Sequence, residues 1–408
     1  MKTLLTLCAG VLGLTASIAH AATGADSYNI VAQGRYLATL GDCTACHTVP
    51  GKPLFSGGVV IDTPFGKLAG ANITPDPGTG IGRWSFEDFQ NVMSKGHGLN
   101  GKRLYGAMPF TAYTKVRRED NLAIWAYLNT VDAVENKVET NQLPFPFNVR
   151  TSLIAWNLMN FTEGEFKADP NKSEQWNRGA YLVEGLGHCG TCHTPKNFIG
   201  GDNSDHFLAG ANLQHWVAPN ITSTGHDGIG AWSQADIVQY LKTGANRFDI
   251  ASGPMAEAVE NSTQHWKEED LLAVATYLKD GAQPAEAAKP VAADDAAMVA
   301  GKAIYADRCS ACHTPTGEGA VNLFPKLAMA PLVNSKDPAS MIRVVLAGSR
   351  AGATDAAPTA PAMPAFGWNL SDENVADVLT YVRNTWGNAA PAVSGSDVKE
   401  VREALLPK

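Results

Sequence analysis

The sequence predicts an all-α protein made of three tandem units, and three observations support this prediction. The pattern Cys-x-x-Cys-His occurs three times, at residues 43–47, 189–193 and 309–313. Segments that follow the first two copies repeat one another. Apolar residues at helical spacing close each unit. Because repetition of this kind marks tandem structural units, we expect three small helical domains.

Each copy of the pattern carries the groups that attach a haem covalently. Two thiols on one turn add to the vinyl groups of the porphyrin, and the adjacent histidine donates a ring nitrogen to the iron. The predicted attachment residues and lower iron ligands are, in order, Cys43, Cys46 and His47, Cys189, Cys192 and His193, and Cys309, Cys312 and His313. Zinc sites and thiol redox centres also use Cys-x-x-Cys. Three copies, all closed by histidine, favour three covalent c-type haems.

The N-terminus has the features of a secretory signal peptide over residues 1–21. Lys2 supplies a positive charge, residues 4–18 are mainly apolar, and Ala19-His20-Ala21 matches an A-x-A cleavage site. A membrane anchor is the alternative, but the apolar part is too short to span a bilayer. Cys8 would leave with this segment, so that every remaining cysteine belongs to a Cys-x-x-Cys-His motif. Since free cysteine pairs tend to form disulfides outside the cytoplasm, haem attachment suits a periplasmic chain.

Length and charge narrow the classes of function. A chain of 408 residues is too long for one typical core and suggests several domains. Its net charge of -8 argues against nucleic-acid binding and leaves docking to a basic partner open. The chain has no dinucleotide-binding, nucleophile-elbow or phosphate-loop motif, so no catalytic residue is assigned.

Amphipathic patterns predict the helix that closes each unit. In the second unit, apolar residues fall at i, i+3, i+4 and i+7, namely Leu271, Val274, Ala275 and Leu278. The third unit repeats this spacing with Val375, Val378, Leu379 and Val382. The first unit matches it in part, with Ile124, Trp125 and Leu128. Acidic pairs precede these residues, where negative charge suits a helix N-terminus: Glu119-Asp120, Glu269-Asp270 and Asp372-Glu373. With two helices packed over a haem, each unit is expected to be a small cytochrome c domain.

Repeated segments and changes of composition set the expected domain boundaries. Asn72-Ile73-Thr74 recurs as Asn220-Ile221-Thr222, and the Gly-x-Trp-Ser segment that follows recurs at the same offset, whereas the third unit lacks both. The expected order is a signal peptide at 1–21, cytochrome c domains at 22–140, 173–280 and 298–390, a packed apolar linker at 141–172, a linker rich in alanine and proline at 281–297, and a C-terminal tail at 391–408.

Methionines are the predicted upper iron ligands. Met108, Met255 and Met363 each precede the closing helix of their unit by a loop, and proline follows the first and the last. A single methionine is usually a core filler, but the repeated placement favours a ligand role. His97 is the rival ligand in the first unit. Because histidine and methionine together occupy both iron coordination positions that the porphyrin leaves open, the predicted function is electron transfer without substrate chemistry at the haem.

The chain resembles the three-haem cytochrome c subunits of periplasmic, membrane-associated dehydrogenases, which act on alcohols, aldehydes, sorbitol, fructose or gluconate. The resemblance rests on the three motifs with their methionines, on Asn72-Ile73-Thr74, on the Gly-x-Trp-Ser segments, on Gly187-His188-Cys189 and on Ala107-Met108-Pro109-Phe110. It implies a catalytic dehydrogenase subunit as partner, with flavin, pyrroloquinoline quinone or molybdenum as its cofactor. It also implies ubiquinone as the electron acceptor, at the outer face of the cytoplasmic membrane.

The C-terminus departs from this resemblance. Family members often end in an apolar or amphipathic segment that holds them to the membrane, whereas this chain ends in a charged run at 397–403. Attachment to the membrane surface through the complex is therefore an alternative to direct contact. Two other functions stay open at this point: a soluble periplasmic electron shuttle without a fixed partner, and an enzyme such as a peroxidase, which would need a five-coordinate haem.

Overall fold

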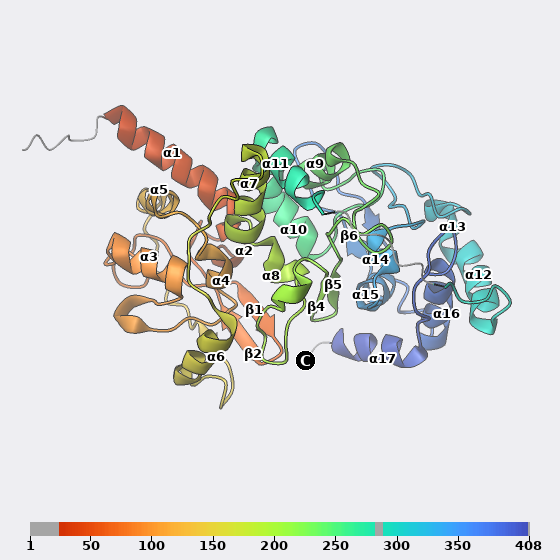
Figure 1. Ribbon diagram of the computed structural model, residues 1–408. Coiled ribbons are helices and arrows are strands. Elements are labelled where there is room, and N and C mark those ends of the chain that lie inside the picture. Colours follow the sequence, from red (N-terminus) through yellow and green to blue (C-terminus); the bar gives the residue numbers. More distant parts are fainter. Residues whose placement is uncertain (1–23, 282–288, 407–408) are drawn as a thin grey trace, which may run out of the picture.

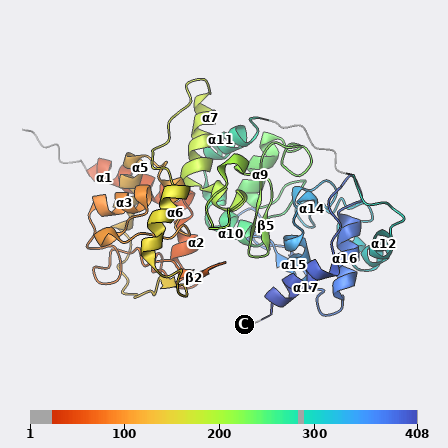
Figure 2. The ribbon, with the colours of Figure 1, turned by 60° about the horizontal axis from the view of Figure 1, so that its bottom comes forward.

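The computed structural model describes residues 24–281 and 289–406 (Figure 1). The predicted signal peptide (1–21), with Lys2 and Cys8, lies outside these residues, as does part of the predicted linker at 281–297. The first unit lies at one end of the molecule, the second in the middle and the third at the other end, in both views (Figures 1 and 2). Among the helices of the described ranges, none is long and apolar enough to cross a membrane.

Each unit has its own set of short elements. The first contains α1 (Gly24–Leu40), α2 (Cys43–His47), β1 (Val60–Thr63), β2 (Gly66–Ala69), α3 (Phe86–Lys95), η1 (Leu99–Gly101), α4 (Phe110–Tyr113) and α5 (Arg118–Leu128). Between the first and second units lie β3 (Asn141–Gln142), η2 (Arg150–Ser152) and α6 (Leu153–Asn160). The second contains α7 (Glu174–Tyr181), the π-helical η3 (Leu182–Leu186), α8 (Cys189–His193), η4 (Ser204–His206), β4 (Ala211–Leu213), β5 (Trp216–Ala218), α9 (Gln234–Thr243), α10 (Pro254–Asn261), η5 (Thr263–His265) and α11 (Glu268–Leu278). The third contains α12 (Ala296–Arg308), α13 (Ser310–His313), α14 (Pro331–Asn334), α15 (Ala339–Ala347), β6 (Ser349–Arg350), β7 (Ala362–Met363), α16 (Asp372–Val382) and α17 (Gly395–Ala404).

The all-α prediction is wrong, because the described residues also form three small antiparallel sheets, which makes the chain mixed α/β. Their strand orders are β1-β2-β3, β4-β5 and β6-β7. In the first unit, the β-branched residues of β1 and the tight turn at Gly66, where φ is 127°, favour a hairpin. Helical spacing of apolar residues predicts only the helices at the ends of each unit, and it predicts no secondary structure for the segments between them. These strands matter for the site, because β7 carries Met363 and β5 ends one residue before Pro219.

The repeated Trp-Ser segments are helix starts. Ser85 and Ser233 cap α3 and α9, and in each capping box the aspartate three residues later, Asp88 or Asp236, bonds back to the serine backbone. Both helices end at a glycine in the left-handed conformation. The repeat therefore preserves a helix with its two ends defined.

The opening and closing helices of every unit cross at a glycine. At Gly34 in α1, an added Cβ would lie 1.8 Å from the Ala123 carbonyl oxygen of α5 and 2.9 Å from the Tyr127 Cβ. Gly179 lies equally close to the backbone of α11, beside Tyr277, and Gly301 lies equally close to the backbone of α16, beside Tyr381. Only glycine allows the two backbones to come this close.

We expect Gly34→Ala to destabilise the first unit by about 3 kcal/mol, because the new methyl group would force the two helices apart in a packed core. Guanidinium unfolding followed by haem absorption measures this. Gly164→Ala is the matched control, since an added Cβ there meets nothing within 4 Å. Equal unfolding midpoints for the two variants would show that the crossing is not constrained by Gly34.

The first and second units share one apolar core, and the third has its own. Buried residues of α1, α5, α7 and α11 belong to a single cluster, whereas the cluster of α12, α15, α16 and α17 includes only Val217 from the second unit. Val217 donates its backbone N–H to the Ser340 Oγ at 2.5 Å, and the His226 Nε2 lies 2.8 Å from the Ala389 carbonyl oxygen. The second unit therefore contacts both of the others.

The first and second units also exchange reciprocal hydrogen bonds. Tyr36 donates to Asp270 Oδ2 at 2.7 Å, and Tyr181 donates to Asp120 Oδ2 at 2.6 Å. Each tyrosine lies two residues after the glycine at its helix crossing, and each aspartate lies in the first turn of its closing helix. The two contacts thus join equivalent positions of the two repeats, as in an interface with approximate two-fold symmetry.

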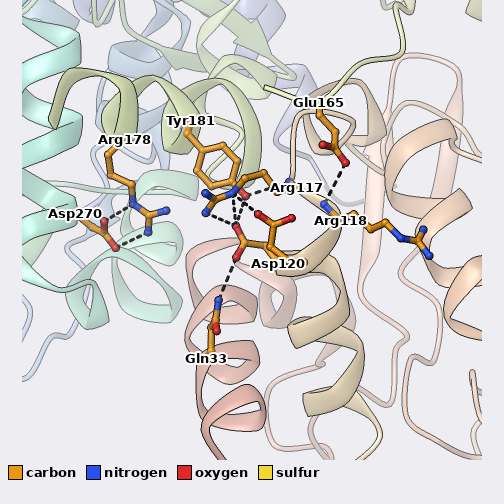
Figure 3. Close-up of polar contacts among 9 residues, drawn as sticks. Gln33, Arg117, Arg118, Asp120, Glu165, Arg178, Tyr181 and Asp270 are labelled. Carbon is orange, nitrogen blue, oxygen red and sulfur yellow. Dashed lines mark hydrogen bonds and ion pairs between the residues drawn. The ribbon is translucent and has the colours of Figure 1, made fainter. Parts of the chain in front are cut away.

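Cations complete this interface on both sides (Figure 3). Arg178 donates from Nε to Asp270 Oδ1 at 2.7 Å and from Nη2 to Oδ2 at 3.0 Å. Arg117 donates from Nη2 to Asp120 Oδ2 at 2.9 Å, and its guanidinium lies 4.9 Å from the centre of the Tyr181 ring. Both carboxylates are buried and both have hydrogen-bond donors on their two oxygens, although the two arginines come from different positions of the repeats.

Candidate haem sites

Each motif histidine is held by a backbone carbonyl from its own unit. A carbonyl oxygen can only accept, so the ring Nδ1 carries the proton and Nε2 is left free for a metal. The Nδ1 atoms of His47, His193 and His313 lie 2.6, 2.7 and 3.1 Å from the carbonyl oxygens of Ala71, Pro219 and Pro325. This arrangement fixes both the tautomer and the orientation that an iron ligand requires.

Burial keeps these three histidines neutral. It lowers the pKa of His47, His193 and His313, because removal from water disfavours the imidazolium more than the carbonyl hydrogen bond favours it. Neutral imidazole is the form that coordinates metal. The electrostatics of the three sites therefore suit a ligand role.

Five of the six motif cysteines are partly buried thiols, and Cys312 is exposed. Burial raises the pKa of Cys43 to about 12, that of Cys189 to about 12 and that of Cys309 to about 11. Thiol redox centres and zinc sites instead stabilise the thiolate. Within residues 24–281 and 289–406, no group of three or more histidine, cysteine, aspartate or glutamate side chains is arranged to hold a metal ion. The raised thiol pKa values are therefore opposite to the lowered values that thiol redox centres and zinc sites require.

Local backbone geometry presents the cysteines on one short helical turn. α2 and α8 begin directly after Asp42 and His188, both in the left-handed conformation with φ of 47° and 37°. This left-handed residue changes the direction of the backbone and so separates each motif helix from the helix before it. Both thiols and the histidine then lie on a five-residue helix.

One cavity joins the second and third candidate sites. Its volume is about 360 Å³ and its walls are mainly apolar, as a porphyrin face requires. It is lined by the predicted haem residues of both units, namely Cys189, Cys192, His193 and Met255 together with Cys309, His313 and Met363. The structure therefore places the histidine and the methionine of each of these units on the same cavity.

The first site is assembled around the core of the first two units. Cys43 and Met108 both pack against that core. His97, the rival ligand, has its Nε2 2.8 Å from Arg103 Nη1, and an arginine can only donate. The lone pair of that nitrogen is used by Arg103. Met108 therefore remains the predicted upper ligand.

Met108→Ala is expected to remove about one third of the methionine-to-iron charge-transfer absorption and to lower the potential of one haem, because methionine ligation raises it. His97→Ala is the matched control and should leave that absorption unchanged. Absorption spectra of the oxidised protein and a redox titration measure both effects. A change in the His97 variant alone would make the first haem bis-histidine.

Two residues that sequence reasoning did not assign lie between the first and second sites. His188 contacts the Tyr113 ring, with centroids 5.5 Å apart, and its Nε2 lies 3.3 Å from the Gly41 carbonyl oxygen, so it belongs to the interface between units. Asp42 has a buried Oδ1 without a hydrogen-bond partner and lines the shared cavity. Burial and the charge of Glu257 raise the pKa of Asp42 to about 8. The sequence signals are that each directly precedes a motif cysteine and that His188 belongs to the Gly187-His188-Cys189 segment of the resemblance.

Comparison with known proteins agrees with this geometry. A family model described as cytochrome c matches residues 298–386. The chain is 38% identical to the gluconate 2-dehydrogenase cytochrome c subunit of Pantoea cypripedii, over 99% of this chain and 95% of the relative. It is 37% identical to the cytochrome c subunit of alcohol dehydrogenase (quinone) from Gluconobacter oxydans (strain 621H), over 98% and 87%. It is also 37% identical to the fructose dehydrogenase cytochrome subunit of Gluconobacter japonicus, over 91% and 82%. With cytochrome c motifs in every unit and this similarity along nearly its whole length, the chain belongs to the family of dehydrogenase cytochrome c subunits.

Proposed function

We propose that this protein is the electron-transfer subunit of a periplasmic dehydrogenase complex and that it carries three covalent haems, one in each unit. The observation that supports this most directly is the arrangement found three times over. In each unit a neutral motif histidine is held by a backbone carbonyl, beside the two cysteines of the same motif, which carry no disulfide. Haem c, when bound, supplies reversible one-electron exchange at its iron.

The chain's own residues would hold each haem on two sides. The cysteines would attach the porphyrin, and the Nε2 of each motif histidine together with Met108, Met255 or Met363 would bind the iron. A filled coordination sphere excludes substrate and oxygen from the iron. The apolar walls of the shared cavity exclude water, which favours a stable potential.

The partner would be a catalytic dehydrogenase subunit. The relatives are named as subunits of gluconate, alcohol and fructose dehydrogenases. By this likeness, a flavin, pyrroloquinoline quinone or molybdenum subunit would oxidise an alcohol, aldehyde, sugar or sugar acid. This chain would then pass the electrons to ubiquinone at the outer face of the cytoplasmic membrane.

The order of the units supports a linear path. The second unit contacts the first through the reciprocal tyrosine–aspartate bonds and the third through Val217 and Ser340. The second and third sites also share one cavity. Electrons that travel between the ends of the protein would therefore pass through the second site.

Haem reduction tests this function. After intact mass has counted the haems, the purified chain alone should be reducible by dithionite and inert toward alcohols, aldehydes and sugars. Adding the catalytic subunit with its substrate should reduce all the haems, and a ubiquinone analogue should reoxidise them, both followed at the α-band. Substrate-driven reduction of the chain alone would instead indicate an enzyme.

A further inference from the structure

An apolar surface without charge lies on α6 and the segments beside it. We call it the α6 surface and define it by its exposed apolar side chains, which are Phe145, Phe147, Val149, Ile154, Leu158, Met159 and Phe198. Leu158 is 83% exposed, Phe145 81% and Phe198 92%. Contiguous exposed apolar surface of this kind marks an interaction site in soluble proteins.

Contacts between the segments make the α6 surface continuous. The Phe147 ring packs against the Phe65 ring, with centroids 5.1 Å apart, and Phe65 lies in the turn between β1 and β2. Trp156 of α6 donates from Nε1 to the Ile199 carbonyl oxygen at 2.9 Å, and Asn197 donates to Asn160 Oδ1 at 2.7 Å. α6 thus joins the hairpin of the first unit to the turn that carries Phe198. Figure 2 shows α6 in front of the first unit.

The inner face of α6 is anchored to the loop of the first candidate iron ligand. Trp156 lies against Gly106, where an added Cβ would be 3.2 Å from its ring, and its ring centroid is 6.2 Å from that of Phe110. Met108 lies between Gly106 and Phe110 in the chain. Ile154 and Leu158, four residues apart, point outward from the same helix face. The inner face is therefore held in place, while Leu158 and part of Ile154 on the outer face remain exposed among the described residues.

Two cations lie beside this surface, since Arg150 directly follows Val149 in the chain and Lys102 lies close to Arg150. Arg150 donates from its guanidinium to the Arg103 carbonyl oxygen and stacks over the Tyr105 ring at 4.7 Å. Burial and the nearby charge of Arg150 lower the pKa of Lys102, and Glu139 is the acidic group close to this pair. The whole chain, in contrast, has a net charge of -8. A local cationic border on an acidic protein selects a negatively charged partner.

We propose that the α6 surface lies on an anionic phospholipid bilayer. Its aliphatic and aromatic side chains would enter the boundary between headgroups and acyl chains, and Lys102 and Arg150 would face the lipid phosphates. An anionic membrane would repel most of this acidic chain, so the cationic border specifies which side faces the lipid. A bilayer also suits an uncharged apolar face that has aromatic residues at its edges.

This placement orients the relay. Because α6 packs on the loop that carries Met108, the first site would be the candidate haem site nearest the lipid. Electrons would then enter at the third unit and leave near the first. This orientation rests on the proposed function, whereas lipid binding by the α6 surface does not.

Vesicle flotation with the haem-loaded protein tests the proposal. The protein is expected to float with phosphatidylcholine vesicles that contain phosphatidylglycerol, less with phosphatidylcholine alone, and less at high salt. Leu158→Glu should lower the vesicle affinity about tenfold, because it places a charge in the apolar contact. Lys102→Gln should weaken binding to the vesicles that contain phosphatidylglycerol and leave binding to pure phosphatidylcholine vesicles unchanged. Val299→Glu, at a 59% exposed site on α12, is the matched control and should bind like the unchanged protein.

The result can be separated from misfolding and from failure of the electron-transfer function. The methionine-to-iron absorption of the Leu158 variant should be unchanged, and detergent-solubilised dehydrogenase should still reduce its haems. Equal flotation of the Leu158 and Val299 variants would overturn the proposal, as would absence of flotation with anionic vesicles. Loss of catalytic-subunit binding in Leu158→Glu, with vesicle binding retained, would also overturn it and assign the surface to the protein partner.

Discussion

Replacing both Cys189 and Cys192 with serine is expected to stop electron transfer from one end of the protein to the other. The serine hydroxyls cannot form the thioether bonds that attach the second haem. Since the second unit lies between the other two, its loss leaves a gap that the first and third sites cannot bridge by themselves. In the complex with the catalytic subunit, substrate should then reduce one terminal haem and leave the other oxidised.

Met255→Ala is the matched control for this experiment. It changes the same site but keeps both cysteines and His193, so the haem should stay attached with a lower potential. Intact mass confirms the number of haems in each variant, and rapid-mixing absorption follows reduction and quinone-dependent reoxidation. Normal reoxidation of both terminal haems in the double-serine variant would refute a path through the second site.

Asp270→Asn is expected to destabilise the interface between the first two units by about 3 kcal/mol at neutral pH, because it leaves Arg178 and Tyr36 without a charged partner in a buried place. Urea unfolding followed by tryptophan fluorescence measures the loss. Asp62→Asn, at an exposed pair with Lys67, is the matched control and should change the free energy of unfolding by less than about 1 kcal/mol.

The effect of Asp270 should also depend on pH. Burial alone would raise the pKa of its carboxyl, but the hydrogen bonds from Arg178 and Tyr36 outweigh burial and lower it. When the pKa of a carboxyl is lower in the folded protein than in the unfolded chain, its ionised form stabilises the fold. This stabilisation is complete at a pH above the pKa of the unfolded chain, and it is lost as the pH falls through the pKa of the folded protein. The difference between the unchanged protein and Asp270→Asn should therefore shrink below about pH 4. A difference that stays constant down to low pH would mean that the carboxylate charge does not matter.

Local patterns predicted the parts of the fold that depend on nearby residues. The spacing of Leu271, Val274 and Leu278 predicts α11, and these residues are buried in it. The strands escaped prediction because they are short and owe their pairing to turns such as the one at Gly66. The hairpin carrying Met363 pairs two segments of only two residues each, which is too short for a period to appear.

Contacts between units could not be predicted from one sequence. Asp120 and Asp270 have the properties of acidic residues in the first turn of a helix, and they do occupy that position. Their second role, accepting hydrogen bonds from Tyr181 and Tyr36 of the other repeat, depends on packing between segments far apart in the chain. The haem residues are different, because their spacing is itself the chemical requirement; their roles as ligands stay predictions for the variants above to test.

The reciprocal tyrosine–aspartate contacts also bear on how the chain arose. In a symmetric homodimer one residue pair is made twice, once from each partner. Joining the two copies end to end would leave the pattern that Tyr36–Asp270 and Tyr181–Asp120 now form within one polypeptide. The third unit has Ala303 and Asn374 at the equivalent positions and so lacks the residues of this contact. The first two units therefore meet as the two halves of a symmetric dimer do, whereas the second meets the third through unrelated contacts, Val217 with Ser340 and His226 with Ala389.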